Sequence, residues 1–310
     1  MSIKVRFADN HEPLIASSQS YLSPVDPPPK VIPLNTDPKS KDKIELILAE
    51  LEGLIGLGNV KKLIYEIRAF VEIQRKRASK GLIAQPTVLH MIFKGNPGTG
   101  KTTVARILGR LFKELGVLHK GHLIEIERAD LVGEYIGQTA QKTREQVKRS
   151  LGGILFIDEA YSLARGGEKD FGKEAIDNLV KAMEDYKDNL ILILAGYKEE
   201  MDFFLQTNPG LRSRFPIHID FPDYQLHELM NIALMMFKER QYYLTPDAET
   251  KLALAIQKKI IFGHRYSGNA RMVRNIVEKS IRQQAVRLMQ HIELSTDDLV
   301  SIMADDLNFE

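Results

Sequence analysis

One stretch of the sequence decides the fold: Gly95-Asn96-Pro97-Gly98-Thr99-Gly100-Lys101-Thr102. It matches the phosphate-binding pattern G-x-x-x-x-G-K-[ST] in full, with an apolar run before it and a helical pattern after it. In such a loop, here called the P-loop, backbone N–H groups surround phosphate oxygens and the helix N-terminus adds its positive dipole end. The motif predicts a nucleotide site at these eight residues and Thr103, with Lys101 on the β- and γ-phosphates and Thr102 on Mg²⁺.

A second motif lies further along the chain, where the apolar run Gly153–Ile157 ends in two carboxylates. Asp158 is expected to hold Mg²⁺ through water, and Glu159 to orient or deprotonate an attacking water. A strand that ends in Asp-Glu is a weak signal alone, but it becomes strong beside the P-loop. The chain has no N-K-x-D motif, which disfavours a GTPase. We therefore expect ATP hydrolysis with ATP and Mg²⁺ as cofactors.

Short apolar runs alternate with helical patterns between residues 88 and 220. The expected strands are Val88–Phe93, His122–Glu127, Gly153–Ile157, Leu190–Ala195 and Ile217–Asp220. The expected helices between them are centred on Thr102–Leu115, Ala140–Ser150 and Glu174–Tyr186. Nearly continuous apolar strands that alternate with helices are typical of a parallel sheet covered by helices on both faces. The fold class is therefore α/β.

The regions on either side of this core have different patterns. Seven of the 13 prolines lie in the first 38 residues, so residues 1–40 are predicted to form a disordered or extended arm. Helical patterns begin at Lys41, and after Pro222 only helices are expected: Gln225–Arg240, Pro246–Phe262, Asn269–Gln290 and Ser295–Met303. The predicted domains are an arm (1–40), an α/β domain (41–221) and a helical domain (222–310).

The composition excludes several classes of site. The chain has no cysteine, so it has no disulfide, thiolate nucleophile or cysteine-ligated metal. Its formal net charge is only +2, whereas proteins that bind nucleic acid without sequence preference are usually more basic. The sequence has no apolar run of the roughly 18 residues that a membrane span needs. These features predict a cytoplasmic protein that does not bind membranes or nucleic acid.

Residues from about 51 to 288 resemble an AAA+ ATPase. Three further segments are similar to the CbbX/CfxQ family of these ATPases: LVGEYIGQTA (131–140), LFIDEAY (155–161) and ILAGY (193–197). The resemblance implies a P-loop NTPase sheet followed by a small all-helical lid domain. It also implies a homo-oligomer, expected to be a hexamer.

The resemblance assigns roles to further residues. Ile55 and Gly56 fall in the segment that lines the adenine pocket in the family, although a turn between two helices would explain them equally well. Arg214 is the first choice for the arginine finger that reaches a neighbouring subunit, and Arg212 the second; the alternative is a surface arginine. Arg271, in Gly268-Asn269-Ala270-Arg271, corresponds to sensor 2, the lid arginine that contacts the nucleotide.

The sequence departs from the family pattern at sensor 1, a polar residue that follows the fourth strand and is often Asn. Here Ala195-Gly196-Tyr197 occupies that place. Tyr197 either presents its hydroxyl to the attacking water or packs against its neighbours, and Asn208 is an alternative sensor.

The work that ATP drives is inferred from a loop. Tyr135-Ile136-Gly137 resembles the aromatic pore loop with which related hexamers grip an extended polypeptide; alternatively, Tyr135 is a core or interface aromatic. The leading hypothesis is a motor that remodels a protein client. A DNA-handling AAA+ protein and a scaffold that hydrolyses ATP slowly are the alternatives. The segment Ser162–Gly172 resembles the sporulation members of this family, which implies a role in sporulation, with a role like that of red-type rubisco activases as the alternative.

Overall fold

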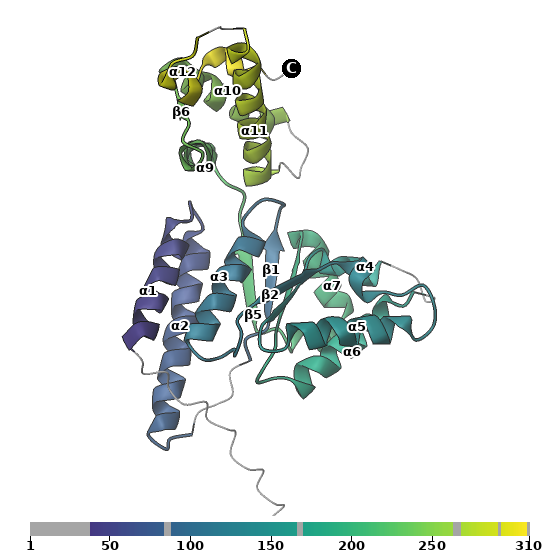
Figure 1. Cartoon of the computed structure of the whole chain (residues 1–310). Coiled ribbons are helices and arrows are strands. Elements are labelled where there is room, and N and C mark those ends of the chain that lie inside the picture. Colours follow the sequence, from purple (N-terminus) through teal and green to yellow (C-terminus); the bar gives the residue numbers. More distant parts are fainter. Residues whose placement is uncertain (1–37, 84–87, 166–169, 263–267, 291–292, 309–310) are drawn as a thin grey trace, which may run out of the picture. The chain divides into compact units, whose positions relative to one another are not determined.

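The computed structural model describes residues 38–83, 88–165, 170–262, 268–290 and 293–308 (Figure 1). Residues 1–37 of the predicted arm lie outside these ranges. The arm's last three residues already belong to the first helix, because α1 spans Pro38–Gly53.

A five-stranded parallel sheet forms the centre of the α/β part, in the order β2-β3-β4-β1-β5. The strands are β1 (Met91–Gly95), β2 (Leu123–Ile126), β3 (Ile154–Ile157), β4 (Ile191–Gly196) and β5 (Ile217–Phe221). β4 lies between β1 and β3, with Ile193 opposite Met91 on one side and opposite Phe156 on the other. The segments that follow β1, β3 and β4 therefore meet at the carboxyl ends of these parallel strands.

Helices cover both faces of this sheet, as the alternation predicts (Figure 1). Alternate strand residues point to opposite faces: Phe93 packs with α1, α2 and α3, whereas Ile92 packs with the α5–α7 side. The helical elements are α2 (Gly58–Ser79), α3 (Lys101–Glu114), α4 (Arg128–Leu131), α5 (Gln138–Ser150), η1 (Ala160–Ala164), α6 (Gly172–Asp185), α7 (Lys198–Thr207) and α8 (Pro209–Arg212).

The C-terminal helices have a core of their own, and this part is here called the lid. Its elements are α9 (Leu226–Glu239), α10 (Pro246–Phe262), α11 (Asn269–Leu288), α12 (Thr296–Val300) and η2 (Ala304–Leu307). Residues 222–225 connect β5 to α9.

The lid differs from expectation in one detail. The prediction that no strand follows Pro222 was wrong, because β6 (Tyr243–Leu244) pairs in parallel with β7 (Ser301–Ile302). The helix predicted over Ser295–Met303 accordingly ends at Val300, and Ser295 and Asp298 form a capping box at its start. Two-residue strands are too short to produce a periodic pattern.

Among the described residues, no helix is long and apolar enough to cross a membrane.

Candidate active site

The P-loop joins β1 to α3 at the carboxyl ends of the strands. Gly100, the last residue before α3, has a φ of +97°, a left-handed conformation that favours glycine. Glycine has no side chain with which to cap α3. The first N–H groups of this helix are therefore left for another acceptor, and the helix dipole favours an anion there.

Lys101 begins α3 and turns back over the loop. Its Nζ donates to the carbonyl oxygens of Gly95 and Asn96, at 2.8 Å each. Burial lowers the pKa of its ammonium group; the carboxylate of Asp158 opposes this shift, and the charge of Arg271 adds to it. A partly desolvated cation therefore lies at the base of the loop.

Asp158 and Glu159 follow β3 directly. The backbone N–H of Glu159 donates to Oδ1 of Asp158 at 3.0 Å. Glu159 has a φ of +46°, a left-handed conformation that costs a residue with a side chain on the order of 1–3 kcal/mol. Both residues line the same cavity as Lys101. The chain therefore tolerates local strain where the two carboxylates meet the P-loop.

Thr102 lies beside these carboxylates on the cavity wall. Its hydroxyl donates to Oε1 of Glu125 on β2 at 3.2 Å, and Arg106 donates to the other oxygen of Glu125 at 3.0 Å. In the described part of the chain, no group of three or more His, Asp or Glu residues could hold a metal alone. An ion at Thr102 and Asp158 would need ligands from a bound phosphate and water, which is the usual way proteins bind Mg²⁺.

Two tyrosines lie next to Glu159. Tyr197 lines the cavity, and its ring centroid is 5.9 Å from that of the buried Tyr161. Burial raises the pKa of both phenols, and the charge of Glu159 raises it further. Asn208, the alternative sensor, donates instead to the carbonyl of Phe204 at 2.9 Å and is absent from the described cavity wall.

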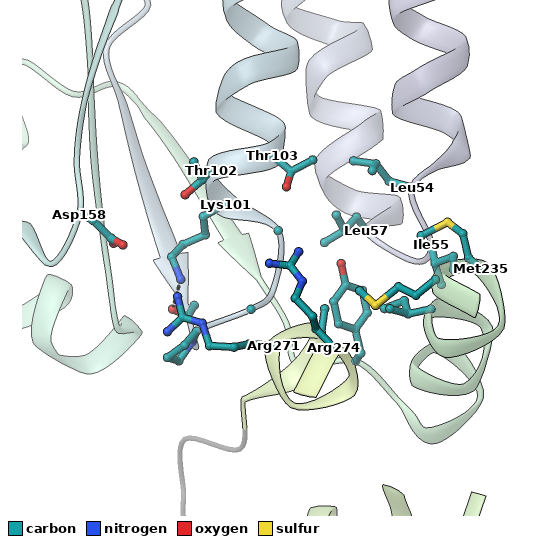
Figure 2. Close-up of a pocket in the computed structure, with 18 of the residues that line it drawn as sticks. Leu54, Ile55, Leu57, Lys101, Thr102, Thr103, Asp158, Met235, Arg271 and Arg274 are labelled. Carbon is teal, nitrogen blue, oxygen red and sulfur yellow. Dashed lines mark hydrogen bonds between the residues drawn. The ribbon is translucent and has the colours of Figure 1, made fainter. Parts of the chain in front are cut away.

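The other end of the cavity is apolar (Figure 2). Tyr224 donates its hydroxyl to the carbonyl of Thr99 at 3.3 Å, and burial raises the pKa of this phenol to about 12. The apolar wall comes from two sides, the turn before α2 and the lid helix α9: Leu54, Ile55, Leu57, Ile232, Met235 and Met236. The whole cavity measures about 440 Å³, within the range usual for sites that bind small molecules.

Two arginines of the lid face this cavity from α11. Arg271 and Arg274 are three residues apart, so they share one face of the helix. Arg271 lies on the side of Lys101, and Arg274 extends toward Leu57 and Thr103 (Figure 2). The cavity thus has a polar end with cations and carboxylates, an apolar end, and a lid arginine near each.

The cavity does not bring together every residue that the sequence singled out. It is lined by Gly95, Pro97, Gly98, Gly100, Lys101, Thr102, Thr103, Ile55, Asp158, Glu159 and Arg271. The residues outside its wall are Gly56, Asn96, Thr99, Arg212, Arg214 and the loop Tyr135–Gly137. Asn96 and Thr99 lie within the P-loop, but Thr99 is buried and Asn96 bonds elsewhere.

Several lining residues were not predicted. The apolar residues of α9 resemble any other lid core positions in sequence, so no local signal separates Met235 from its neighbours. Arg274 did carry a signal, because it lies one helical turn after Arg271.

Two family models match the chain. That of the AAA ATPases, "ATPase family associated with various cellular activities", covers residues 91–223, and that of the AAA lid domain covers residues 225–310.

Curated relatives match most of the chain. Stage V sporulation protein K of Bacillus subtilis is 59% identical, over 84% of this chain and 81% of its own length. The chloroplastic ribulose bisphosphate carboxylase/oxygenase activase of Cyanidioschyzon merolae is 46% identical, over 86% of this chain and 91% of its own. Protein CfxQ of Xanthobacter flavus is 46% identical, over 81% and 79%.

Solved structures share the fold at low sequence identity. The FIGL-1 AAA domain in complex with ADP has a TM-score of 0.55 at 17% identity, covering 82% of this chain and 80% of that one. A point mutant of Thermotoga maritima RuvB has a TM-score of 0.53 at 20% identity, covering 83% and 69%.

Proposed function

Because the chain belongs to the AAA ATPases, in the group that contains stage V sporulation protein K and the CfxQ proteins, we propose that its cavity binds ATP with Mg²⁺ and hydrolyses it. The single observation that carries this proposal is the shape and chemistry of one cavity. Its polar end joins the P-loop, Asp158, Glu159 and Arg271, and its other end is lined mainly by apolar residues.

The cavity residues fit ATP and Mg²⁺. The N–H groups at the start of α3 and the Lys101 ammonium hold the phosphates, and the apolar end formed around Ile55 and Tyr224 holds adenine. Thr102 and Asp158 hold Mg²⁺, which when bound supplies positive charge that offsets the charge of the phosphates.

Each polar residue has a distinct role in hydrolysis. Glu159 accepts the proton of the water that attacks the γ-phosphorus, and Tyr197 orients that water from the end of β4. Lys101 and Arg271 stabilise the charge that develops on the γ-phosphoryl oxygens. Arg214, with Arg212 as second choice, acts on the site of a neighbouring subunit.

Two substitutions test the ATPase. We expect Lys101→Ala to abolish ATP binding, because it removes the partly buried cation of the loop. We expect Glu159→Gln to bind ATP but to turn over ~10²–10⁴-fold more slowly, because it removes the proton acceptor. Nucleotide binding by calorimetry and phosphate release measure both effects.

The exposed Lys62 of α2 provides the matched control, since Lys62→Ala removes one positive charge away from the cavity. Turnover by Glu159→Gln at the wild-type rate would contradict the role of this carboxylate.

The energy of hydrolysis drives the remodelling of a protein client through the pore of a hexamer in the cytoplasm. Tyr135 is 67% exposed and Ile136 is 90% exposed, and Gly137 has a φ of +85°. Two neighbouring apolar side chains in water, on a loop that glycine lets turn, suit contact with an extended polypeptide of any sequence. This exposure argues against Tyr135 as a core residue of its own chain.

The client belongs to sporulation, a role supported by the 59% identity to the sporulation protein. A role like that of rubisco activases is the second candidate, because the algal activase is 46% identical over most of both chains.

Tyr135→Ala separates the motor from its alternatives. We expect ATP turnover within ~3-fold of wild type and loss of client remodelling, because the aromatic ring supplies most of the grip on the client and takes no part in the cavity wall. Clients captured by the Glu159→Gln variant in pull-down experiments supply the substrate for the assay.

Tyr135→Phe is the matched control and is expected to remodel normally. Remodelling by Tyr135→Ala at the wild-type rate would contradict the pore-loop role. ATP-dependent DNA binding that the substitution leaves unchanged would favour a DNA-handling protein instead.

A further inference from the structure

A polar network joins the P-loop to the lid through the segment that connects them. Asn96 of the P-loop donates its Nδ2 to both carboxylate oxygens of Asp223, at 2.9 Å each. Asn269, the first residue of α11, donates its Nδ2 to Oδ1 of the same carboxylate at 2.8 Å. Asp223 thus receives one side chain from the P-loop and one from the lid.

Asn269 is the most constrained member of this network. It is only 2% exposed, and its Oδ1 accepts the backbone N–H of Tyr224 at 3.0 Å. It has a φ of +41°, a conformation that Asn tolerates better than most residues but that still costs energy. The bonds to Asp223 and Tyr224 therefore fix the direction in which α11 begins.

The backbone makes the same connection. The N–H of Ala270 donates to the carbonyl of Gly98 in the P-loop at 3.2 Å. A Cβ at Gly98 would overlap the carbonyl oxygen of Gly268 and lie 2.8 Å from the N of Arg271. This P-loop glycine is thus required by the contact with the lid as well as by its own positive φ of +75°.

Asn96 stands at a position that the P-loop motif leaves open, so phosphate binding does not explain its identity. Its side chain points to Asp223 and not into the cavity. Within the first turns of the same helix, α11 carries Arg271 and then Arg274 into the cavity. The network is therefore placed to set where both arginines lie relative to the P-loop.

We propose that Asp223 is a positioning residue that, through Asn96 and Asn269, fixes the first turn of α11 on the P-loop and thereby holds the lid arginines over the nucleotide. Only the effect on turnover rests on the proposed ATPase function. The effect on the lid itself is independent of it.

Breaking the network separates positioning from binding. Asp223→Ala removes no residue of the cavity wall. It also removes a charge that raises the pKa of Lys101, and the exchanged double variant below restores a negative charge to the network at residue 269. We expect ATP turnover to fall at least ~10-fold while the Kd for ADP changes less than ~3-fold, since misplaced arginines act mainly on the transition state. Asp188→Ala, at an exposed turn, removes the same charge elsewhere and is expected to behave as wild type.

An exchange of the two side chains supplies the rescue. In the double variant Asp223→Asn with Asn269→Asp, the new amide donates to the new carboxylate and still accepts from Asn96. In the single variant Asp223→Asn, the new amide group faces the amide donor of Asn96. In the single variant Asn269→Asp, the new carboxylate faces the carboxylate of Asp223. We therefore expect both single variants to lose turnover and the double variant to recover to within ~3-fold of wild type.

A distance measurement reports the position of the lid relative to α2 and does not depend on ATP turnover. The chain has no cysteine, so spin labels at Glu66→Cys on α2 and Gln257→Cys on α10, both exposed, meet no background. We expect a narrow distance distribution in the otherwise wild-type protein, a broad one with Asp223→Ala, and a narrow one again in the exchanged double variant.

The outcomes distinguish the two proposals. Failure of the wild-type protein to hydrolyse ATP would overturn the proposed function. The positioning role of Asp223 would then be tested by the distance measurement alone. An unchanged distribution and turnover with Asp223→Ala, or a double variant no better than the single ones, would overturn the positioning role. Should Asp223→Ala not fold, Asn96→Ser tests the two bonds between the P-loop and Asp223 from the partly exposed P-loop side.

Discussion

At the residue scale, His90 shows how a side chain can take the place of a backbone acceptor. It precedes β1, and its Nδ1 accepts the backbone N–H of Leu192 on β4 at 3.0 Å. The residue is only 5% exposed, and its ring lies 5.8 Å from that of Phe215. Burial lowers its pKa to about 4. The folded protein therefore holds this imidazole neutral, with Nδ1 as acceptor.

The shift predicts a loss of stability in mild acid. The unfolded chain binds a proton at His90 near pH 6.5, whereas the folded chain does so only near pH 4. The contribution of His90 is thus fully present above pH 6.5 and is lost as the pH falls toward 4. We expect the free energy of unfolding to fall by about 2 kcal/mol from this residue between pH 7.5 and pH 5, measured by urea denaturation.

His90→Asn is the matched variant, because its Oδ1 accepts the same N–H and does not titrate. We expect it to be less stable at pH 7.5 but to lose about 2 kcal/mol less than wild type on going to pH 5. Parallel pH profiles for the two proteins would contradict the prediction.

At the scale of elements, the spacing of apolar residues predicted those helices and strands that bury a regular set of side chains. The five strands and the helices α3, α5, α6, α9, α10 and α11 lie within a few residues of their predicted bounds. The central strands β1, β3 and β4 are almost entirely buried because helices cover both faces of the sheet, and their apolar runs show this directly in the sequence. The edge strands β2 and β5 carry exposed Glu125, His218 and Asp220. The elements α4, α8, β6 and β7 were not predicted, because two to four residues are too short to show a period. The longer helix α7 was not predicted either.

The end of α11 that contacts the P-loop illustrates the same limit. Gly268-Asn269-Ala270-Arg271 reads in sequence as the N-terminus of a helix with an arginine in its first turn. Neither the left-handed conformation of Asn269 nor its bond to Asp223 follows from that pattern. Both depend on bringing residues 96, 223 and 269 together, which only the folded chain does.

At the scale of the whole molecule, Arg214, the proposed arginine finger, lies outside the cavity of its own chain. Its Nη2 donates to Oε1 of Glu184 at 2.5 Å and its Nη1 donates to the carbonyl of Gly210 at 2.9 Å. It is absent from the described wall of its own cavity. A role for this arginine in hydrolysis therefore requires the site of another subunit.

Mixing two inactive variants tests this role. We expect Arg214→Ala alone to hydrolyse ATP ~10³-fold more slowly, the effect of removing a typical arginine finger. Mixing it with Glu159→Gln should restore part of the turnover, because an intact Glu159 then meets an intact Arg214 across an interface. Steady-state phosphate release at a concentration where both variants oligomerise measures the rescue.

Mixing Arg212→Ala with Glu159→Gln decides between the two arginines. Only substitution of the arginine finger lowers ATP turnover alone and recovers part of it in the mixture. A fully active monomer at high dilution would exclude either assignment.

The sequence by itself determined the P-loop, the paired carboxylates after β3, the parallel α/β sheet and the helical lid. These features depend on the spacing of motif residues and on periodic burial, and both can be recognised in the sequence itself. Only the tertiary structure decided which residues form the apolar end of the cavity and that Asn96 faces Asp223. The physical reason is that each of these features is a contact between side chains distant in sequence, and such contacts leave no local pattern.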